Sequence, residues 1–143
     1  MSGVCVFACR AEYEQRLRAS LEAGETRYVG LARGITREKG SMRRGSSARI
    51  RYVRRRVHAG HSLLDLVPES HAPRAIGKHL AGIGHPLIGD ARDGDARTNA
   101  YFWHRHGLDR AFLHLESVRL ERDAGPLELR SELASDLRAV LES

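Results

Sequence analysis

Cysteine is scarce in this sequence, where Cys5 and Cys9 are the only two among 143 residues. Two cysteines cannot supply the set of disulfides that holds small secreted domains together. Residues four apart on a strand share one face, and both thiols lie among apolar neighbours. We therefore predict buried, reduced thiols of a cytoplasmic protein, and neither a disulfide nor a metal-binding pair.

Long hydrophobic runs are also absent. A membrane-spanning helix needs roughly 20 consecutive apolar residues, and no segment approaches that length. The apolar patch from Val4 to Ala8 has no basic segment before it, which argues against a secretory signal peptide. The sequence therefore predicts no membrane partner.

Acidic residues are too few to balance the basic ones. The chain has 24 Lys and Arg against 18 Asp and Glu, a net charge of +6 and a sequence pI of about 10.0. Arginines gather in one section, namely Arg43, Arg44, Arg49, Arg51, Arg54, Arg55 and Arg56. Basic contacts to phosphates release counterions, so a nucleic acid is the expected partner. The alternative is an arginine-rich composition that reflects a GC-rich genome.

The hydrophobic pattern predicts strands at residues 4–8, 28–32, 48–56, 62–67, 113–120 and 127–130. Helices are expected at residues 11–22, at residues 73–83 and after Ser131. Residues 34–47 and 90–110 are polar and are predicted to be loops. This mixture, with its short hairpin-like links, predicts one α+β domain over residues 1–143. Its sheet should be mixed and mainly antiparallel, with flanking helices.

The most distinctive stretch runs from His61 to Asp90 and reads HSLLDLVPESHAPRAIGKHLAGIGHPLIGD. Its second half, from Lys78 onward, resembles a segment of the RluA-type pseudouridine synthases, which isomerise uridine in RNA. Further segments similar to the family lie before and after this stretch, in the family's order, at residues 2–8, 26–31, 112–115 and 125–129. The resemblance implies a truncated pseudouridine-synthase-like domain, structured ribosomal or transfer RNA as the partner, and no cofactor or metal.

The resemblance also implies that no catalytic residue is present. The family's catalytic aspartate belongs to a His-Arg-Leu-Asp block, and this chain begins just after the place where that block would lie. The family arginine that pairs with this aspartate aligns with Ala72. Asp109 lies in a Leu-Asp-Arg string but lacks the Thr-Ser-Gly that should follow. We therefore predict a catalytically impaired protein.

Several residues are candidates for binding RNA. Tyr28 aligns with the family tyrosine that stacks on the target base, although an inner-strand tyrosine is equally compatible with a core position. The predicted RNA-binding residues are Arg27, Arg49, Arg51, Arg55, Arg74, Lys78 and His79. His104 and His106 lack an acidic or cysteine companion, so no metal site is predicted.

Three hypotheses follow for the function. The first is an RNA-binding, catalytically impaired relative of the synthases. The second is an active or split synthase whose start is misassigned. The third is a protein-interaction remnant without an RNA role, in which an unpaired sheet edge supports self-association.

Overall fold

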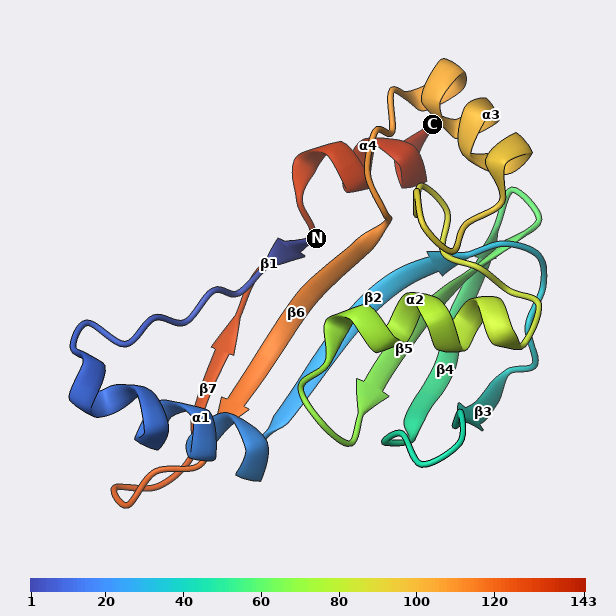
Figure 1. The fold of residues 1–143 in the computed structure, drawn as a ribbon. Helices are drawn as coiled ribbons and strands as arrows, with labels where there is room; N and C mark the ends of the chain where they lie inside the picture. The colour runs from blue at the N-terminus through green and yellow to red at the C-terminus, as the bar shows by residue number, and fades with distance from the viewer.

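The computed structural model describes all residues 1–143 and is built on one sheet of seven strands (Figure 1). The strand order is β1-β6-β2-β5-β4-β3, and β7 also pairs with β6. Only β1 runs parallel to its neighbour. The strands are β1 (Ser2–Gly3), β2 (Glu25–Ala32), β3 (Lys39–Met42), β4 (Ile50–His58), β5 (His61–Pro68), β6 (Leu113–Leu120) and β7 (Leu127–Arg130). The predicted α+β fold with a mainly antiparallel sheet is therefore confirmed.

Four helices flank this sheet. They are α1 (Glu14–Ala23), α2 (Pro73–Gly82), α3 (Ala96–His106) and α4 (Ser135–Glu142), and a 3₁₀ turn, η1 (Ala11–Tyr13), precedes α1. Helix α2 lies across one face of the sheet (Figure 1), where its Ile76 and Leu80 join the core formed by Tyr28, Leu64 and Leu66. None of the helices combines the length and the apolar character that a membrane span requires.

The opposite face of the sheet is covered at one end only. Side chains alternate along a strand, so Val29, Leu31 and Leu63 face away from α2. They pack with Phe102 of α3 and Leu137 of α4 in a second core. Both helices lie at the top of the molecule in Figure 1. The rest of this face carries no covering helix.

The prediction for residues 4–8 was wrong, because they do not form a central strand. Only Ser2 and Gly3 pair with β6, at the edge of the sheet, before the chain runs on to η1. Val4 and Val6 pack against the first core, and the alternate residues therefore face outward. Cys5 and Cys9 are both exposed free thiols, so their predicted burial was also wrong. The apolar pattern was real, but no element of this chain covers its outer side.

Two of the predicted loops contain regular structure. Residues 34–47 include β3, a short edge strand that pairs only with β4. Residues 90–110 include α3, whose first turn is capped by Asp95: its carboxylate accepts the Thr98 backbone N–H at 2.8 Å. The helix ends at Gly107, which has a φ of 67°. The apolar pattern did not predict α3, because Phe102 alone among its residues is fully buried.

A hydrogen-bonded chain of side chains ties β1 to α4. The Arg110 guanidinium binds both carboxylate oxygens of Asp136, at 2.8 and 2.9 Å, and also donates to the Ser2 hydroxyl at 3.1 Å. The Ser2 hydroxyl in turn lies 2.9 Å from Nδ1 of buried His114, whose Nε2 lies 3.1 Å from the Ser131 carbonyl oxygen. This arrangement gives His114 a structural role.

The ion pair predicts how stability depends on pH. The hydrogen bonds from Arg110 lower the pKa of Asp136 below its ordinary value of 3.8. A depressed folded-state pKa adds stability above pH 3.8, and this contribution is lost as pH falls through the folded-state pKa. Asp136→Asn should therefore reduce stability at pH 7 by no more than about 1 kcal/mol, since the pair is partly exposed and screened. The difference from the unmodified chain should shrink below pH 3.8 in urea unfolding.

Asp123 provides the matched control for this substitution. It pairs with Arg16 at 3.7 Å, but its side chain is fully exposed. Asp123→Asn should therefore leave stability at pH 7 unchanged. Equal losses in the two variants would show that the Arg110 pair contributes nothing particular to the fold.

Candidate nucleic-acid interface

Basic side chains gather on the part of the sheet that no helix covers. Arg27 of β2, Lys39 of β3, and Arg49 and Arg51 beside and within β4 line a cavity of about 680 Å³. All four are exposed, and we call this cavity the basic groove. Its other lining residues include Glu25, Asp65, Val53 and Val67.

The strand register explains why these cations meet. Arg49 and Arg51 are two residues apart, so they share a face of the strand roughly 7 Å from each other. Arg51 pairs across the sheet with Val67 on one side and Ser41 on the other, which fixes its place in the groove. Arg51 and Lys39 have no carboxylate partner, whereas Arg27 lies 3.2 Å from Glu25. The groove therefore presents a net positive surface of the size of a few nucleotides.

Arg55 is on the same strand but is already neutralised. Its guanidinium donates to Asp65 at 2.7 Å and to Glu116 at 2.6 Å. These two carboxylates raise the pKa of Arg55, chiefly through the Asp65 hydrogen bond, and bridge β4 to β5 and β6. Its geometry suits a structural ion pair better than a contact to phosphate.

Arg74 and Lys78 lie on the other side of the sheet, on α2. Both are exposed and line a second cavity of about 510 Å³, together with Arg92, Asp90 and Asp93. We call it the α2 cavity. The Asp90 carboxylate accepts the backbone N–H groups of Arg92 and Asp93, at 2.9 and 3.2 Å, so it closes a turn. The structure thus separates the predicted RNA-binding residues onto two opposite sides.

His79 is buried within α2, although it was predicted to contact RNA. Its side chain is 3% exposed. Nδ1 lies 2.6 Å from the Ala75 carbonyl oxygen and Nε2 lies 2.9 Å from the Ser47 hydroxyl. Both ring nitrogens are therefore occupied, and the ring ties α2 to the segment before β4.

Tyr28 lies in the first core and is fully buried in this conformation. Its hydroxyl is 3.3 Å from Nδ1 of His71, an exposed residue just before α2. Burial raises the pKa of Tyr28 to about 12, so the hydroxyl stays protonated at neutral pH. Since Tyr28 is fully buried, a base would reach its ring only after neighbouring side chains moved aside. Ala72, the next residue, is the N-cap of α2 and offers no side-chain hydrogen bond.

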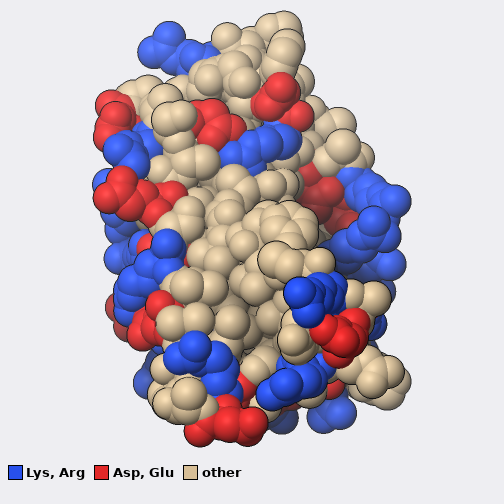
Figure 2. Space-filling model, turned by 90° about the vertical axis from the view of Figure 1, so that its left-hand side faces the viewer, with Lys and Arg blue, Asp and Glu red and all other residues tan.

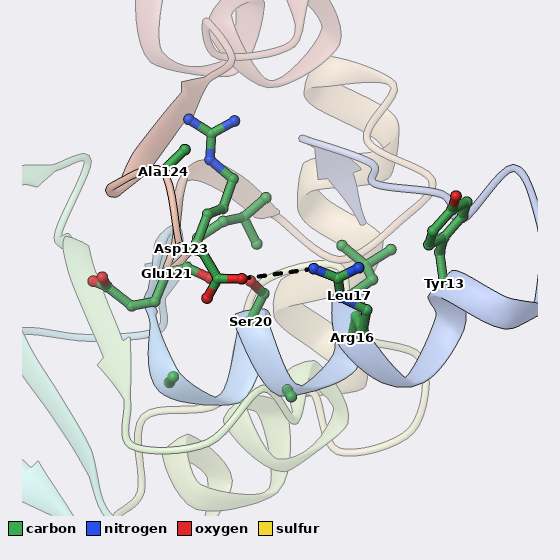
Figure 3. Close-up of a pocket in the computed structure, with 11 residues that line it drawn as sticks. Tyr13, Arg16, Leu17, Ser20, Glu121, Asp123 and Ala124 are labelled. Carbon is green, nitrogen blue, oxygen red and sulfur yellow. Dashed lines mark hydrogen bonds and ion pairs between the residues drawn. The ribbon is translucent and has the colours of Figure 1, made fainter.

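A third groove lies between α1 and the β6–β7 turn (Figure 3). It has a volume of about 650 Å³, and Leu17 and Leu120 are among its apolar lining residues. Its Arg16 points toward Asp123, at 3.7 Å. With its charges opposed in this way, the groove is a weaker candidate for a polyanion than the basic groove.

The remaining candidates do not assemble into a reactive site. Asp109 is exposed in the loop that leads into β6. His104 is exposed on α3, and Nδ1 of His106 is 2.9 Å from the Ser143 hydroxyl. No group of three or more His, Cys, Asp or Glu side chains is placed to hold a metal ion. Lys39 was not among the predicted residues, because no strand was expected where β3 lies. The exposed aromatics of α3 were not predicted either, because residues 90–110 were expected to be a loop.

Comparison with known proteins gives partial matches to pseudouridine synthases, although no family model matches the chain. The chain is 33% identical over 84 residues to the ribosomal large subunit pseudouridine synthase C of Vibrio vulnificus, covering 57% of this chain and 26% of that protein. It is 37% identical over 62 residues to the tRNA pseudouridine synthase C of Yersinia pestis, covering 43% of this chain and 24% of that protein.

Solved structures show the same fold. Human RNA pseudouridylate synthase domain containing 4 superposes with a TM-score of 0.69 at 15% identity, covering 90% of this chain and 64% of that one. Human RNA pseudouridylate synthase domain containing 1 gives a TM-score of 0.59 at 18% identity, covering 85% and 57%. The alignments with the two bacterial relatives span about a quarter of their length. Over part of its sequence and in its fold, the chain is similar to pseudouridine synthases, as its resemblance to the RluA type predicted.

Proposed function

We propose that this chain binds structured RNA, ribosomal or transfer, through the basic groove. The observation that carries the proposal is the gathering of Arg27, Lys39, Arg49 and Arg51 on the one part of the sheet without a covering helix. The proteins that it matches are named as pseudouridine synthases of the ribosomal large subunit and of tRNA, which supports the same class of ligand. Arg74 and Lys78 add a second, weaker contact beside α2, where acidic neighbours offset part of their charge.

We further propose that the chain does not isomerise uridine by itself. We also propose that it works in the cytoplasm, where Cys5 and Cys9 stay reduced. The aligned position of the family's arginine is Ala72, whose methyl group can neither orient a carboxylate nor lower its pKa. The carboxylate of Asp90 in the α2 cavity is engaged by backbone N–H groups, which supports a structural role for it.

One experiment tests both parts of this proposal. Transfer RNA carrying tritium at uracil C5 should bind, and the logarithm of its affinity should fall with that of salt concentration with a slope of about −3 for four cationic contacts. No tritium should be released, whereas an RluA-type synthase on its own substrate provides the positive control. Binding indifferent to salt would contradict the groove. Tritium release would contradict impairment and favour the active or split enzyme.

Self-association is the second candidate function, favoured by the exposed segment after β1. Phe7 is 79% exposed and Met1 57% exposed, and Cys5 and Cys9 lie beside them. Figure 2 looks onto this side and shows an uncharged stretch bordered by charged side chains. Strand β1 also leaves one edge unpaired. Phe7→Ser should abolish a dimer in sedimentation if this surface joins two copies, and a chain that is monomeric at all concentrations would exclude the idea.

A further inference from the structure

The exposed side of helix α3 combines aromatic and cationic side chains and carries no acidic ones. Residues 96–106 contain no Asp or Glu. The N-cap carboxylate of Asp95 is engaged by the Thr98 backbone N–H and hydroxyl. Two large aromatics are exposed on this helix, Tyr101 at 58% and Trp103 at 53%. This surface is separate from the basic groove and from the α2 cavity.

Tyr101 lies between two arginines on one stripe of the helix. Arg97 precedes it by four residues and Arg105 follows it by four, so each lies about one turn away, roughly 6 Å along the axis. Both arginines are exposed, and neither forms an ion pair or a side-chain hydrogen bond. The stripe thus places one flat ring between two free guanidinium groups.

The Tyr101 ring is held in place although it is exposed. Its centroid lies 5.5 Å from that of Phe102 and 6.3 Å from that of His106, both in edge-to-face geometry. Phe102 is itself anchored in the second core. An ordered ring loses little freedom when a ligand stacks on it, which favours binding.

We propose that the Arg97–Tyr101–Arg105 stripe is a stacking site for an unpaired base of an RNA strand, with the arginines binding the phosphates on either side. The inference rests on RNA being the ligand of this chain, and adds a contact to single-stranded nucleotides outside the basic groove. Stacking on an exposed aromatic ring tolerates any base, and flanking cations bind the backbone. Helix α3 itself carries no acidic residue, and its one acidic neighbour near the stripe is the N-cap Asp95, beside Arg97. This excess of aromatic and cationic groups matches a single strand better than a protein surface of mixed charge.

The test uses a fluorescein-labelled single strand of twelve uridines and an abasic strand with the same sugar–phosphate backbone, both followed by anisotropy. Tyr101→Ala should weaken binding of the uridine strand at least about fivefold and leave the abasic strand within about twofold. Tyr101→Phe should restore the affinity, since the ring is kept. Arg97→Gln with Arg105→Gln should reduce the salt slope by about 1.4 for both strands.

Trp103 is the matched control. It is a larger aromatic of similar exposure on the same helix, but Asn99 and Gly107 occupy the positions four residues away. Trp103→Ala should therefore change neither affinity. If Tyr101→Ala binds the uridine strand like the unmodified chain, or Trp103→Ala alone weakens it, the stacking site is refuted while the basic groove stands. If the unmodified chain binds neither these strands nor transfer RNA, both proposals fail.

Discussion

Replacing Arg27, Arg49 and Arg51 together by glutamine should weaken transfer RNA binding by about 100-fold at about 0.1 M salt. Each phosphate contact releases about 0.7 to 0.9 counterions, which at this salt concentration is worth about 1 kcal/mol. Three contacts therefore contribute about 3 kcal/mol, and 1.4 kcal/mol is a factor of ten. The slope of log affinity against log salt should flatten by about 2 to 3. Filter binding over a range of salt concentrations measures both quantities.

The control must remove the same charge from another place. Arg10, Arg16 and Arg18 are exposed on the η1–α1 segment, and each lies near a carboxylate, of Glu12, Asp123 and Glu14 respectively. Changing these three to glutamine lowers the net charge from +6 to +3, as the groove variant does. Affinity should fall only a few-fold, through the weaker overall attraction. Equal losses in the two triple variants would mean that net charge, and not the groove, binds RNA.

Arg55 shows that a cation on β4 need not be available to bind phosphate. It lies on β4 close to Arg51, but Asp65 and Glu116 already hold its guanidinium. Breaking this bridge leaves two carboxylates near the groove, so Arg55→Gln would repel RNA indirectly while also loosening three strands. A phosphate binds most strongly to cations that do not have to give up a carboxylate partner. Arg51 and Lys39 should therefore contribute more to RNA affinity than Arg55.

The sequence predicted best those strands in which apolar residues alternate and one face is buried. Strands β6 and β7 have the bounds that the alternation of apolar residues indicates. Helix α3 was missed because tertiary packing of Phe102, rather than an apolar stripe, holds it, although Asp95 and Gly107 marked its ends. The segment after β1 was wrongly predicted because an apolar pattern shows which residues tend to be buried, and not whether something covers them.

The same limit applies to the candidate site. A strand was predicted at residues 48–56, and in the structure Arg49 and Arg51 line the same groove. The local pattern could not show that Arg55 pairs with Glu116, sixty-one residues further along the chain, or that the Ser47 hydroxyl lies within hydrogen-bonding distance of the His79 ring. Nor could it show that Arg74 lies on the opposite side of the sheet from the groove. Contacts distant in sequence decide which cations are free, and local patterns carry no information about them.

Tyr28→Ala should reduce the free energy of unfolding by about 3 to 5 kcal/mol, because a fully buried aromatic ring leaves a cavity in the first core. Tyr28→Phe keeps the ring and loses only the hydroxyl contact to His71, so its effect should be about 1 kcal/mol. Urea unfolding at neutral pH measures both. A loss below about 1 kcal/mol for Tyr28→Ala would mean that this residue is not part of the core.

His71→Ala then decides whether Tyr28 also contacts RNA. Nδ1 of His71 lies 3.3 Å from the Tyr28 hydroxyl, and His71 is exposed, so removing its ring should change stability little. If a base stacks on Tyr28, RNA binding includes the free energy of moving His71 aside, and the variant should bind several-fold more tightly. If Tyr28 acts only in the core, the affinity should not change. The substitution removes the group that contacts the Tyr28 hydroxyl and keeps the tyrosine. It therefore distinguishes the two roles, whereas Tyr28→Ala disrupts the core and cannot.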